Sequence, residues 1–480
     1  MNTDYKSIAN KLKFEGRAFI DGKYVDAIDG KKFENINPAT GKTLCSIAKC
    51  NHKDVDLAVR VSRKAFESGV WSKTSPEFRK NTLLKFADLL RHHGVENSVL
   101  ECVDTGKLIG DCINEVSNDA PMHFQWYGEL IDKVFGKVGP TDPSITSLIV
   151  KEPIGVVAGV VPWNFPLMMT VWKAAPALAA GCSVIIKPAE DTPLTAIRVA
   201  QIAKEAGIPD GVFNVVPGFG DVGEALGRHH DVDAVSFTGS TEVGGLFMKY
   251  SGESNLKTVG LEMGGKSPFI VLEDAKITDD LIDNALNSAF WNGGQNCSAN
   301  MRQIIHSKVK NIKVGDPLDP KINMGSMISK KHLETVNGYI QKGIDEGASL
   351  LYGGVSNEDQ KGFFAKPTLF DNLKEDMTIA QEEIFGPVLG ILTVNNTEEA
   401  LKIASNSKYG LHASVFTQDI NKAFHIAKSL PCGTVSVNTF SEGDIKTPFG
   451  GYKQSGSLSR DQGTEALNQY LQTKTIWISH

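Results

Sequence analysis

The sequence predicts an α/β protein that contains two blocks of parallel strands. Its 480 residues exceed the usual size of one domain, which is about 150 residues, so several folding units are expected. Short apolar runs at 155–161, 183–187 and 212–216 alternate with stretches of helical periodicity. Strands that are apolar along their whole length are typical of a parallel sheet covered on both faces. A second alternating block starts near residue 269, which indicates two α/β domains with a cleft between them.

The first half of the chain begins with a short hairpin. Asp21-Gly22 separates the apolar residues of 19–25, and this dipeptide favours a two-residue turn. In several later stretches the apolar residues recur at a spacing near 3.6, and this period predicts amphipathic helices. We expect these helices at 53–69, 76–94, 118–134, 168–180, 193–206 and 221–229.

The second half repeats the alternation of strands and helices. We expect strands at 269–272, 388–394 and 414–417, and helices at 276–291, 330–346, 397–405 and 419–429. The last apolar segment, 474–478, follows a polar helix and has the pattern of a strand. An exposed strand needs a partner, and a neighbouring subunit is one place where it can pair.

Composition and charge exclude several classes of protein. Hydrophobic residues make up 41% and charged residues 22%, which is ordinary for a folded chain and excludes general disorder. The net charge of -6 provides no basic field for nucleic acid or anionic lipid. No apolar run approaches the ~20 residues of a membrane-spanning helix, and the polar N-terminus lacks a signal-peptide pattern. The seven cysteines show neither CxxC nor Cys/His zinc spacing, so we expect a reduced, cytoplasmic protein without a metal site.

Two glycine-rich loops follow predicted strands and are candidates for phosphate binding. Gly218 to Gly223 matches GxGxxG, but this pattern alone fits an ordinary turn between a strand and a helix equally well. The loop 237–244 contains Ser240 and Thr241 at the start of a helix. Free N–H groups and hydroxyls at such a position bind phosphate, or the hydroxyls simply cap their own helix.

Lys187 and Glu190 lie at the end of the predicted strand 183–187 and just after it. In open α/β sheets, ligands bind at the carboxyl ends of the strands. There the lysine could bond ribose hydroxyls. The glutamate could accept a hydrogen bond from a ribose 2′-hydroxyl and would repel a 2′-phosphate. A surface ion pair between the two residues is the alternative interpretation.

Three further residues carry the polar groups that a nucleophilic mechanism needs. Cys297 lies in the loop 293–298, after the predicted helix 276–291. Most cysteines are buried and inert, whereas a position in a polar loop favours a reactive thiolate. From local sequence alone, the two interpretations of Cys297 carry similar weight. Glu262 stands beside a Gly-Gly turn and is either a catalytic base or an exposed loop residue. Asn164 lies between two prolines, where its amide could stabilise an oxyanion or the turn could only pack aromatic rings.

Seven motifs in a fixed order extend over essentially the whole chain. They are PWNFP (162–166), KPAE (187–190), FTGSTEVG (237–244), LEMGGKSP (261–268), GQNCS (294–298), EEIFGPVL (382–389) and PFGGYKQSG (448–456). With these motifs the sequence resembles the aldehyde dehydrogenase superfamily. Within it, the chain is most similar to the γ-glutamyl-γ-aminobutyraldehyde dehydrogenases of putrescine breakdown, through WYGELIDKV (126–134), GDIKTPFGGYKQSG (443–456) and KTIWIS (474–479).

The resemblance implies a covalent mechanism that oxidises an aldehyde to a carboxylic acid. Cys297 would attack the aldehyde carbon to give a thiohemiacetal, and loss of hydride would leave a thioester. Asn164 and the backbone N–H of Cys297 would hold the oxyanion. Glu262 would activate the water that hydrolyses the thioester, with Lys173 as a proton-relay partner.

The resemblance also implies that NAD is the cofactor. The cofactor-binding residues would be Lys187, Glu190, Gly218, Ser240, Trp163, Glu383 and Phe385. Lys187 and Glu190 would hold the adenosine ribose, which favours NAD over NADP. Ser240 would hold the pyrophosphate, and Glu383 would bond the nicotinamide ribose. In this pattern the GxGxxG match at Gly218 is not the main phosphate cradle.

By the same matching, a tunnel lined by aromatic and methionine side chains would hold the substrate. Its residues would be Asp119, Phe165, Met169, Trp172, Glu442, Asp444 and Phe449. Carboxylates near its mouth could meet an ammonium group, so we expect an ω-aminoaldehyde such as γ-glutamyl-γ-aminobutyraldehyde. An ordinary polar loop is the alternative reading of Glu442 and Asp444.

Other functions stay open at this point. A broad-specificity or betaine-type aldehyde dehydrogenase is one alternative. A coenzyme A-acylating relative is another, although Glu262 favours hydrolysis because it can activate water. An inactive structural relative is the third. The expected partners are a small aldehyde and further copies of the chain, in a homodimer or homotetramer, without nucleic acid or membrane.

The implied fold has a modified Rossmann cofactor domain, a catalytic domain and a small β oligomerisation arm. We assign the cofactor domain to 1–135 and 152–261, the catalytic domain to 262–455, and the arm to 136–151 and 456–480.

The sequence departs from the family pattern at three places. Between Cys297 and Gly315, roughly three helical turns of ~3.6 residues are missing. The segment 220–223 looks one residue short, and 455–460 looks one residue long. No matched catalytic position is lost, so we expect activity, with folding efficiency as the property at risk.

Overall fold

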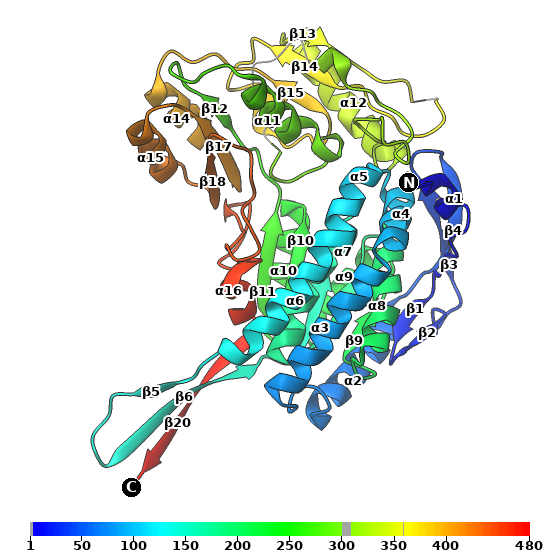
Figure 1. Cartoon of the computed structure of the whole chain (residues 1–480), viewed down its shortest axis with the longest axis vertical. Helices are drawn as coiled ribbons and strands as arrows, with labels where there is room; N and C mark the ends of the chain where they lie inside the picture. The colour runs from blue at the N-terminus through cyan, green and yellow to red at the C-terminus, as the bar shows by residue number, and fades with distance from the viewer. Residues whose placement is uncertain (1–2, 300–308, 359) are drawn as a thin grey trace.

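The computed structural model describes residues 3–299, 309–358 and 360–480, and it shows two lobes and a projecting arm (Figure 1). The large lobe holds a seven-stranded sheet in the order β11-β10-β7-β8-β9-β1-β2. Its strands are β1 (Ala18–Ile20), β2 (Lys23–Val25), β7 (Val156–Val160), β8 (Ser183–Lys187), β9 (Phe213–Val215), β10 (Ala234–Gly239) and β11 (Thr258–Met263). The strands from β11 to β9 run parallel, which confirms the prediction from their apolar runs. The hairpin β1–β2 adds an antiparallel edge.

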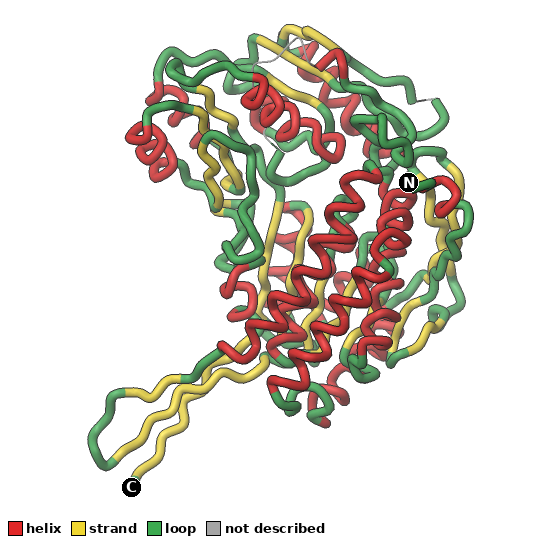
Figure 2. The backbone as a smooth tube through the Cα atoms, viewed as in Figure 1, coloured by secondary structure: helices red, strands yellow, loops and turns green. Residues whose placement is uncertain are grey.

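Helices cover both faces of this sheet (Figure 2). One face carries α2 (His52–Ser68), α9 (Gly220–Arg228) and α10 (Thr241–Gly252). The other carries α7 (Pro166–Ala180) and α8 (Leu194–Ala206), with α3 (Pro76–His92), α4 (Gly94–Thr105) and α6 (Ala120–Leu130) packed against them. Every residue of α7 is buried, because this helix lies between the sheet and other helices.

Local sequence accounts for the ends of these helices. Asn51 accepts the N–H of Lys53 while Asp54 accepts the N–H of Asn51, which forms a capping box at the start of α2. Pro166 begins α7, and Gly181 ends it with a φ of 100°, a left-handed conformation that glycine adopts without strain. These signals explain why the helix boundaries follow the sequence closely.

The small lobe confirms the second α/β block, but its longer strands form two separate three-stranded sheets, and the short strands β16 (Tyr409–Gly410) and β19 (Tyr452–Lys453) pair with each other. The parallel sheet has the order β12-β17-β18, with β12 (Phe269–Val271), β17 (His412–Phe416) and β18 (Thr434–Val437). The other sheet has the order β13-β14-β15, with β13 (Ser349–Tyr352), β14 (Thr368–Asp371) and β15 (Val388–Gly390). The helices of this lobe are α11 (Asp279–Phe290), α12 (Lys330–Asp345), α13 (Thr378–Gln381), α14 (Thr397–Ser405) and α15 (Ile420–Ser429).

The arm is a three-stranded antiparallel sheet that projects from the large lobe (Figure 1). It consists of β5 (Lys137–Gly139), β6 (Ile145–Pro153) and β20 (Leu471–Ser479). The C-terminal strand β20 pairs along its whole length with β6, so one of its partners comes from the same chain. Helix α16 (Gly463–Asn468) precedes β20, and it packs against α7 of the large lobe as well as against β20.

Several elements differ from the expectation. The helix expected at 118–134 begins as a π-helical turn, Ile113–Asp119, continues as α6 and ends as a 3-10 turn, Ile131–Lys133. Elements without a sequence prediction include α4 and α1 (Tyr5–Ala9), α5 (Ile109–Cys112), β3 (Lys32–Asn37), β4 (Lys42–Ala48), β16 (Tyr409–Gly410) and β19 (Tyr452–Lys453). The shortening expected after Cys297 involves 300–308, outside the described residues. Among the described helices, none is long and apolar enough to cross a membrane.

Candidate active site

A cavity of about 570 Å³ lies between residues of the two lobes, at the carboxyl ends of the parallel strands. Ligands of open parallel sheets bind at this position. The sequence-predicted residues that line it are Asp119, Trp163, Asn164, Phe165, Met169, Trp172, Ser240, Glu262, Cys297, Glu383, Phe385, Glu442, Asp444 and Phe449. The predicted residues that do not line it are Lys173, Lys187, Glu190 and Gly218.

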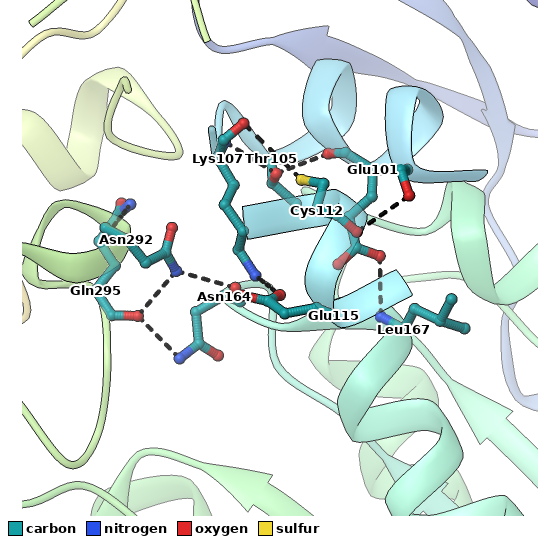
Figure 3. A network of polar contacts seen from close by, with 10 residues as sticks. Glu101, Thr105, Lys107, Cys112, Glu115, Asn164, Leu167, Asn292 and Gln295 are labelled. Carbon is teal, nitrogen blue, oxygen red and sulfur yellow. Dashed lines mark hydrogen bonds and ion pairs between the residues drawn. The ribbon is translucent and has the colours of Figure 1, made fainter. Parts of the chain in front are cut away.

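The loop that carries Cys297 is tied to the turn that carries Asn164 (Figure 3). The Asn164 side chain donates to the Gln295 carbonyl at 3.0 Å, and Asn292 donates to the Asn164 carbonyl at 3.1 Å. Positive φ angles at 292–294 turn the chain sharply here, and glycine at two of these positions makes that backbone accessible. One N–H of the Asn164 amide thus holds the loop. The other has no acceptor among the residues that the structure describes and can serve a ligand.

Cys297 is half-buried, and its surroundings favour the neutral thiol. Burial raises the pKa of Cys297 well above its usual value. The carboxylates of Glu442, Glu383 and Glu262 raise the same pKa further. A reactive thiolate therefore needs a positive charge or N–H donors close to the sulfur, of the kind that a bound ligand brings.

Glu262 lies near the end of β11 and lines the cavity. It is buried, and neither carboxylate oxygen has a hydrogen-bond partner among the described residues. Burial raises its pKa well above the usual value, and Asp461 raises it further. Lys173 and Arg460 oppose this increase. Gly450 leaves room for the carboxylate, because a Cβ there would stand 2.6 Å from Oε1 of Glu262. An unpaired carboxyl group in such a cavity is suited to general acid–base work.

Lys173 forms an ion pair with Asp461, a residue that the sequence analysis did not select. Both side chains are at most 3% exposed, and both act on the pKa of Glu262. The two partners are 288 residues apart in the chain, and Asp461 directly follows the unusual segment 455–460. No local pattern could reveal this contact, because only the tertiary fold brings the C-terminal segment to α7.

The residues expected to hold an adenosine ribose lie at the end of β8. Lys187 Nζ and Glu190 Oε2 are 3.2 Å apart, so the ion pair of the alternative interpretation is present. Burial lowers the pKa of Lys187, and Glu190 opposes this change. The Glu190 side chain is 41% exposed, which leaves its carboxylate accessible to a ligand.

Ser240 is the N-cap of α10, and its Oγ accepts the N–H of Val243 at 3.3 Å. This is the capping role of the alternative interpretation, yet the loop 238–240 also lines the cavity. Gly218 has a packing role, because a Cβ there would stand 2.5 Å from Cγ2 of Val222.

Glu383 and Phe385 enter the cavity from the small lobe. Glu383 accepts the N–H of Gly265 at 3.0 Å. Burial raises the pKa of Glu383 to about 7, and this hydrogen bond opposes the increase. Phe385 has a φ of 56°, which is unusual for an aromatic residue, and its ring centroid lies 5.2 Å from that of Trp163. Backbone strain of this kind is concentrated at functional sites.

Aromatic and methionine side chains form the apolar part of the cavity. Trp172 packs edge-to-face on Phe449 with 5.4 Å between ring centroids, and Phe165 packs on Trp291 at 5.2 Å. Lining residues that the sequence analysis did not select include Glu115, Met122, His123, Met168, Trp291, Asn296 and Ile445. Glu115 on the π-helical turn and Met122 and His123 on α6 recur at a helical spacing. In the sequence this spacing indicates only a helix that faces the core, so it could not reveal a ligand site.

Glu442 is turned toward the cysteine loop. It accepts hydrogen bonds from the Ser298 hydroxyl and from Asn296 Nδ2, the latter at 3.2 Å. It therefore contacts both sequence neighbours of Cys297. Burial raises the pKa of Glu442, and the two hydrogen bonds oppose the increase.

The other two carboxylates of the predicted tunnel mouth have different surroundings. Asp444 is exposed, and a hydrogen bond from the Lys446 backbone N–H lowers its pKa. Asp119 is also exposed, although partial burial of its carboxyl raises its pKa. The loop carboxylates Glu442 and Asp444 are close in sequence, but only Glu442 bonds the residues beside the cysteine.

A buried charge cluster supports the turn 164–167 (Figure 3). Lys107 forms an ion pair with Glu115, and its Nζ lies 3.9 Å from the centroid of the Phe165 ring. A second buried carboxylate, Glu101, accepts a backbone N–H of the same turn at 3.2 Å. Burial raises the pKa of Glu115 to about 8, and Lys107 opposes the increase.

Neither a disulfide bond nor a metal-binding cluster is found in the described part of the chain. All seven cysteines are free. The residues that the structure describes contain no group of three or more His, Cys, Asp or Glu side chains arranged to hold a metal ion.

Comparisons with known proteins agree with the motifs. The model of the aldehyde dehydrogenase family matches residues 24–476. The aminoacetaldehyde dehydrogenase of Pseudomonas aeruginosa is 45% identical, over 99% of this chain and 98% of the relative. The solved structure of γ-glutamyl-γ-aminobutyraldehyde dehydrogenase from Burkholderia cenocepacia J2315 has a TM-score of 0.95 and 46% identity. P. syringae AldA, an indole-3-acetaldehyde dehydrogenase solved as a mutant with NAD+ and IAA, has a TM-score of 0.96 and 44% identity. Both structures cover 99% of each chain. A match over nearly the whole chain, together with relatives of this identity, confirms the resemblance: the chain belongs to the aldehyde dehydrogenase family.

Proposed function

We propose that this enzyme oxidises an aldehyde to a carboxylic acid with NAD, and that Cys297 is its nucleophile. The single observation that carries the proposal is that Cys297, Glu262 and Asn164 line one cavity. Cys297 attacks the carbonyl carbon as the thiolate, and the oxyanion of the thiohemiacetal accepts hydrogen bonds from the Asn164 amide and from the backbone N–H of residue 297. Loss of hydride from this carbon leaves a thioester on the sulfur.

Glu262 completes the reaction by activating water. Its carboxylate takes a proton from the water, and the oxygen attacks the thioester to release the acid and the Cys297 thiolate. The positive charge of Lys173 favours the ionised form of Glu262, while Asp461, which holds that lysine in place, opposes it. A carboxylate at this position supports hydrolysis over transfer of the acyl group to coenzyme A.

The residues around the cavity fit a dinucleotide. Bound NAD supplies a positively charged ring that accepts the hydride. The N-terminus of α10, with Ser240, offers backbone N–H groups of the kind that bind pyrophosphate. Lys187 and Glu190 lie at the strand end where an adenosine ribose is expected. Glu383 lines the cavity and can accept hydrogen bonds from the hydroxyls of the nicotinamide ribose. The exposed Glu190 carboxylate would repel a 2′-phosphate, which favours NAD over NADP.

We also propose that an ω-aminoaldehyde is the preferred substrate. Glu115, Asp119, Glu442 and Asp444 all line the cavity, so an ammonium group meets acceptors there. Relatives named for aminoacetaldehyde and for γ-glutamyl-γ-aminobutyraldehyde support this class of substrate. The apolar wall favours the second candidate, a broad-specificity enzyme for neutral aldehydes, because it suits any extended aliphatic chain.

The assembly that we propose is a homo-oligomer joined through the arm. Strand β20 is an edge strand of its sheet, and it exposes 62% of Trp477 and 42% of Ile478. Exposed apolar groups on an open edge are typical of an interface. We also place the enzyme in the cytoplasm, since free cysteines suit a reducing compartment.

One assay tests the chemistry and the substrate class together. Wild type should form NADH and free acid in equal amounts without coenzyme A, with a higher kcat/KM for 3-aminopropanal than for butanal. Cys297→Ala should form no NADH, whereas Cys432→Ala, at a half-buried cysteine outside the cavity, should keep the wild-type rate. Glu262→Gln should release about one NADH per active site and then stall, because its thioester hydrolyses slowly.

Three results would contradict the proposal. NADH formation by Cys297→Ala would show that Cys297 is not the nucleophile. A product that forms only in the presence of coenzyme A would show that the thioester is cleaved by acyl transfer and not by hydrolysis. Equal kcat/KM values for the two aldehydes would favour the broad-specificity alternative.

A further inference from the structure

A polar patch inside the cavity has no part in the proposed reaction. His123 on α6 and Trp172 on α7 both line the cavity, and their rings stack at an interplanar angle of 26° with 6.1 Å between centroids. Nε2 of His123 and Nε1 of Trp172 are buried, and neither has a hydrogen-bond partner among the residues that the structure describes. Buried polar atoms without partners are costly, so such a pair indicates a place for a polar ligand group.

The two nitrogen atoms have opposite hydrogen-bonding character. Nδ1 of His123 lies 2.9 Å from the Asp119 carbonyl oxygen, which can only accept, so Nδ1 carries the hydrogen. Burial lowers the pKa of His123 to about 4, so the ring is neutral near pH 7 and Nε2 is an acceptor. The indole N–H of Trp172 can only donate. The two stacked rings therefore bring one acceptor and one donor, both shielded from solvent, to the same part of the wall.

Three methionines flank this pair along the two helices, and the polar residue that lines the cavity nearby is Asp119, one turn before His123. Met122 precedes His123 on α6, and Met168 and Met169 lie one turn before Trp172 on α7. All three methionines line the cavity. A polar group of a ligand that lies among these methionines thus finds hydrogen-bonding atoms at His123 and Trp172, while the Asp119 carboxylate lies one helical turn farther along.

We propose that His123 and Trp172 form a subsite for a hydroxyl group of the substrate. A hydroxyl oxygen donates one hydrogen bond and accepts another, so one group satisfies both nitrogen atoms. An ammonium group only donates and leaves the Trp172 N–H unsatisfied, while an alkyl chain leaves both atoms unsatisfied. His123 is then a specificity-determining residue for hydroxyaldehydes. This inference rests on the proposed function, because it assumes that the cavity receives the aldehyde.

Two pairs of aldehydes of matched length test the subsite. They are 3-hydroxypropanal with butanal, and 6-hydroxyhexanal with heptanal; intermediate hydroxyaldehydes are avoided because they close into cyclic hemiacetals. The measured quantity is the kcat/KM of the hydroxyaldehyde divided by that of its alkyl partner. His123→Phe removes the acceptor but keeps a ring, and His123→Gln keeps an acceptor. His425→Phe, at an exposed position of α15, is the matched control.

For at least one pair, His123→Phe should lower this ratio about tenfold, which is the effect of one net hydrogen bond. His123→Gln should stay within about threefold of wild type because its amide oxygen replaces the acceptor. A ratio that changes by less than about twofold in both pairs, or an equal fall in His425→Phe, would overturn the subsite, since one hydrogen bond exceeds that range.

Failure of the proposed function gives a different result. Wild type would then form no NADH with any of the four aldehydes. The subsite keeps its own readout in that case, because calorimetry on Cys297→Ala compares the affinities of the two aldehydes without turnover. A preference for the hydroxyaldehyde that is lost in Cys297→Ala/His123→Phe supports the subsite, and the absence of a preference overturns it.

Discussion

Replacing Lys107 by methionine should break the buried charge cluster beside the catalytic turn. Glu115, whose side chain is 8% exposed, would lose its partner, and the contact with the Phe165 ring would be lost as well. Removing one member of a buried ion pair costs about 3–5 kcal/mol, and a desolvated cation–π contact is worth about 2 kcal/mol. Burial raises the pKa of Glu115 and Lys107 opposes this increase, so the pKa rises further without the lysine and the lone carboxyl takes up a proton at pH 7. Protonation limits the loss, and we expect a net cost of about 3 kcal/mol.

Thermal unfolding at pH 7 measures this cost. In a domain of about 150–250 residues, each kcal/mol lowers Tm by about 2–4 °C, so Lys107→Met should unfold about 6–12 °C below wild type. The double variant Lys107→Met/Glu115→Leu should recover most of the loss, because apolar side chains of similar volume replace a buried ion pair at little cost. Lys422→Met, which breaks the exposed pair with Glu273, is the control and should shift Tm by less than about 2 °C.

Two outcomes would refute this reasoning. A Tm of Lys107→Met within about 2 °C of wild type would show that the buried pair contributes no more than an exposed one. A double variant as unstable as the single variant would show that packing around the lysine, and not the unpaired carboxyl of Glu115, causes the loss.

Three more predictions concern the site. Glu442→Gln removes one of the charges that raise the pKa of Cys297, so alkylation of the cysteine by iodoacetamide should reach half its maximal rate at a lower pH than in wild type. Glu190→Ser removes the carboxylate that repels a 2′-phosphate, so kcat/KM with NADP relative to NAD should rise about tenfold or more. In the folded protein the pKa of Glu383 is raised from 4.5 to about 7. Its contribution to the free energy of unfolding is therefore complete below pH 4.5 and is lost as pH rises through 7. Glu383→Gln should flatten the decrease of Tm over this pH range.

Each of these predictions has a result that contradicts it. An unchanged alkylation profile in Glu442→Gln would mean that the charge of this residue does not reach the sulfur. An unchanged preference for NAD in Glu190→Ser would mean that other groups select the cofactor. A pH dependence of Tm in Glu383→Gln equal to that of wild type and of the exposed control Glu382→Gln would exclude Glu383 as its source.

The sequence was sufficient for those features that local chemistry controls. Apolar runs that alternate with helical periods predicted the parallel sheet, and Asp21-Gly22 predicted the hairpin β1–β2 that the structure contains. The ordered motifs identified the family, and most residues selected through that resemblance line the cavity around Cys297, whereas Lys173, Lys187, Glu190 and Gly218 do not. These features depend on residues within a few positions of one another, so they can be recognised without knowing the rest of the fold.

Other features came only from the tertiary structure. The ion pair of Lys173 with Asp461 joins residues 288 positions apart, and the unpartnered nitrogen atoms of His123 and Trp172 lie on two different helices. The C-terminal strand was expected to need a partner, but only the fold identified β6 of the same chain.

The amino-acid sequence by itself determined the periodicity, the helix caps and the turns of this protein. The energies of these features depend on residues within one short segment of the chain. Which charge meets which partner, and how far burial shifts a pKa, depend on the distances and solvent exclusion created when distant segments pack. The tertiary structure alone decided that Glu442 bonds the residues beside the cysteine while Asp444 remains in solvent, although the two are separated by a single glycine.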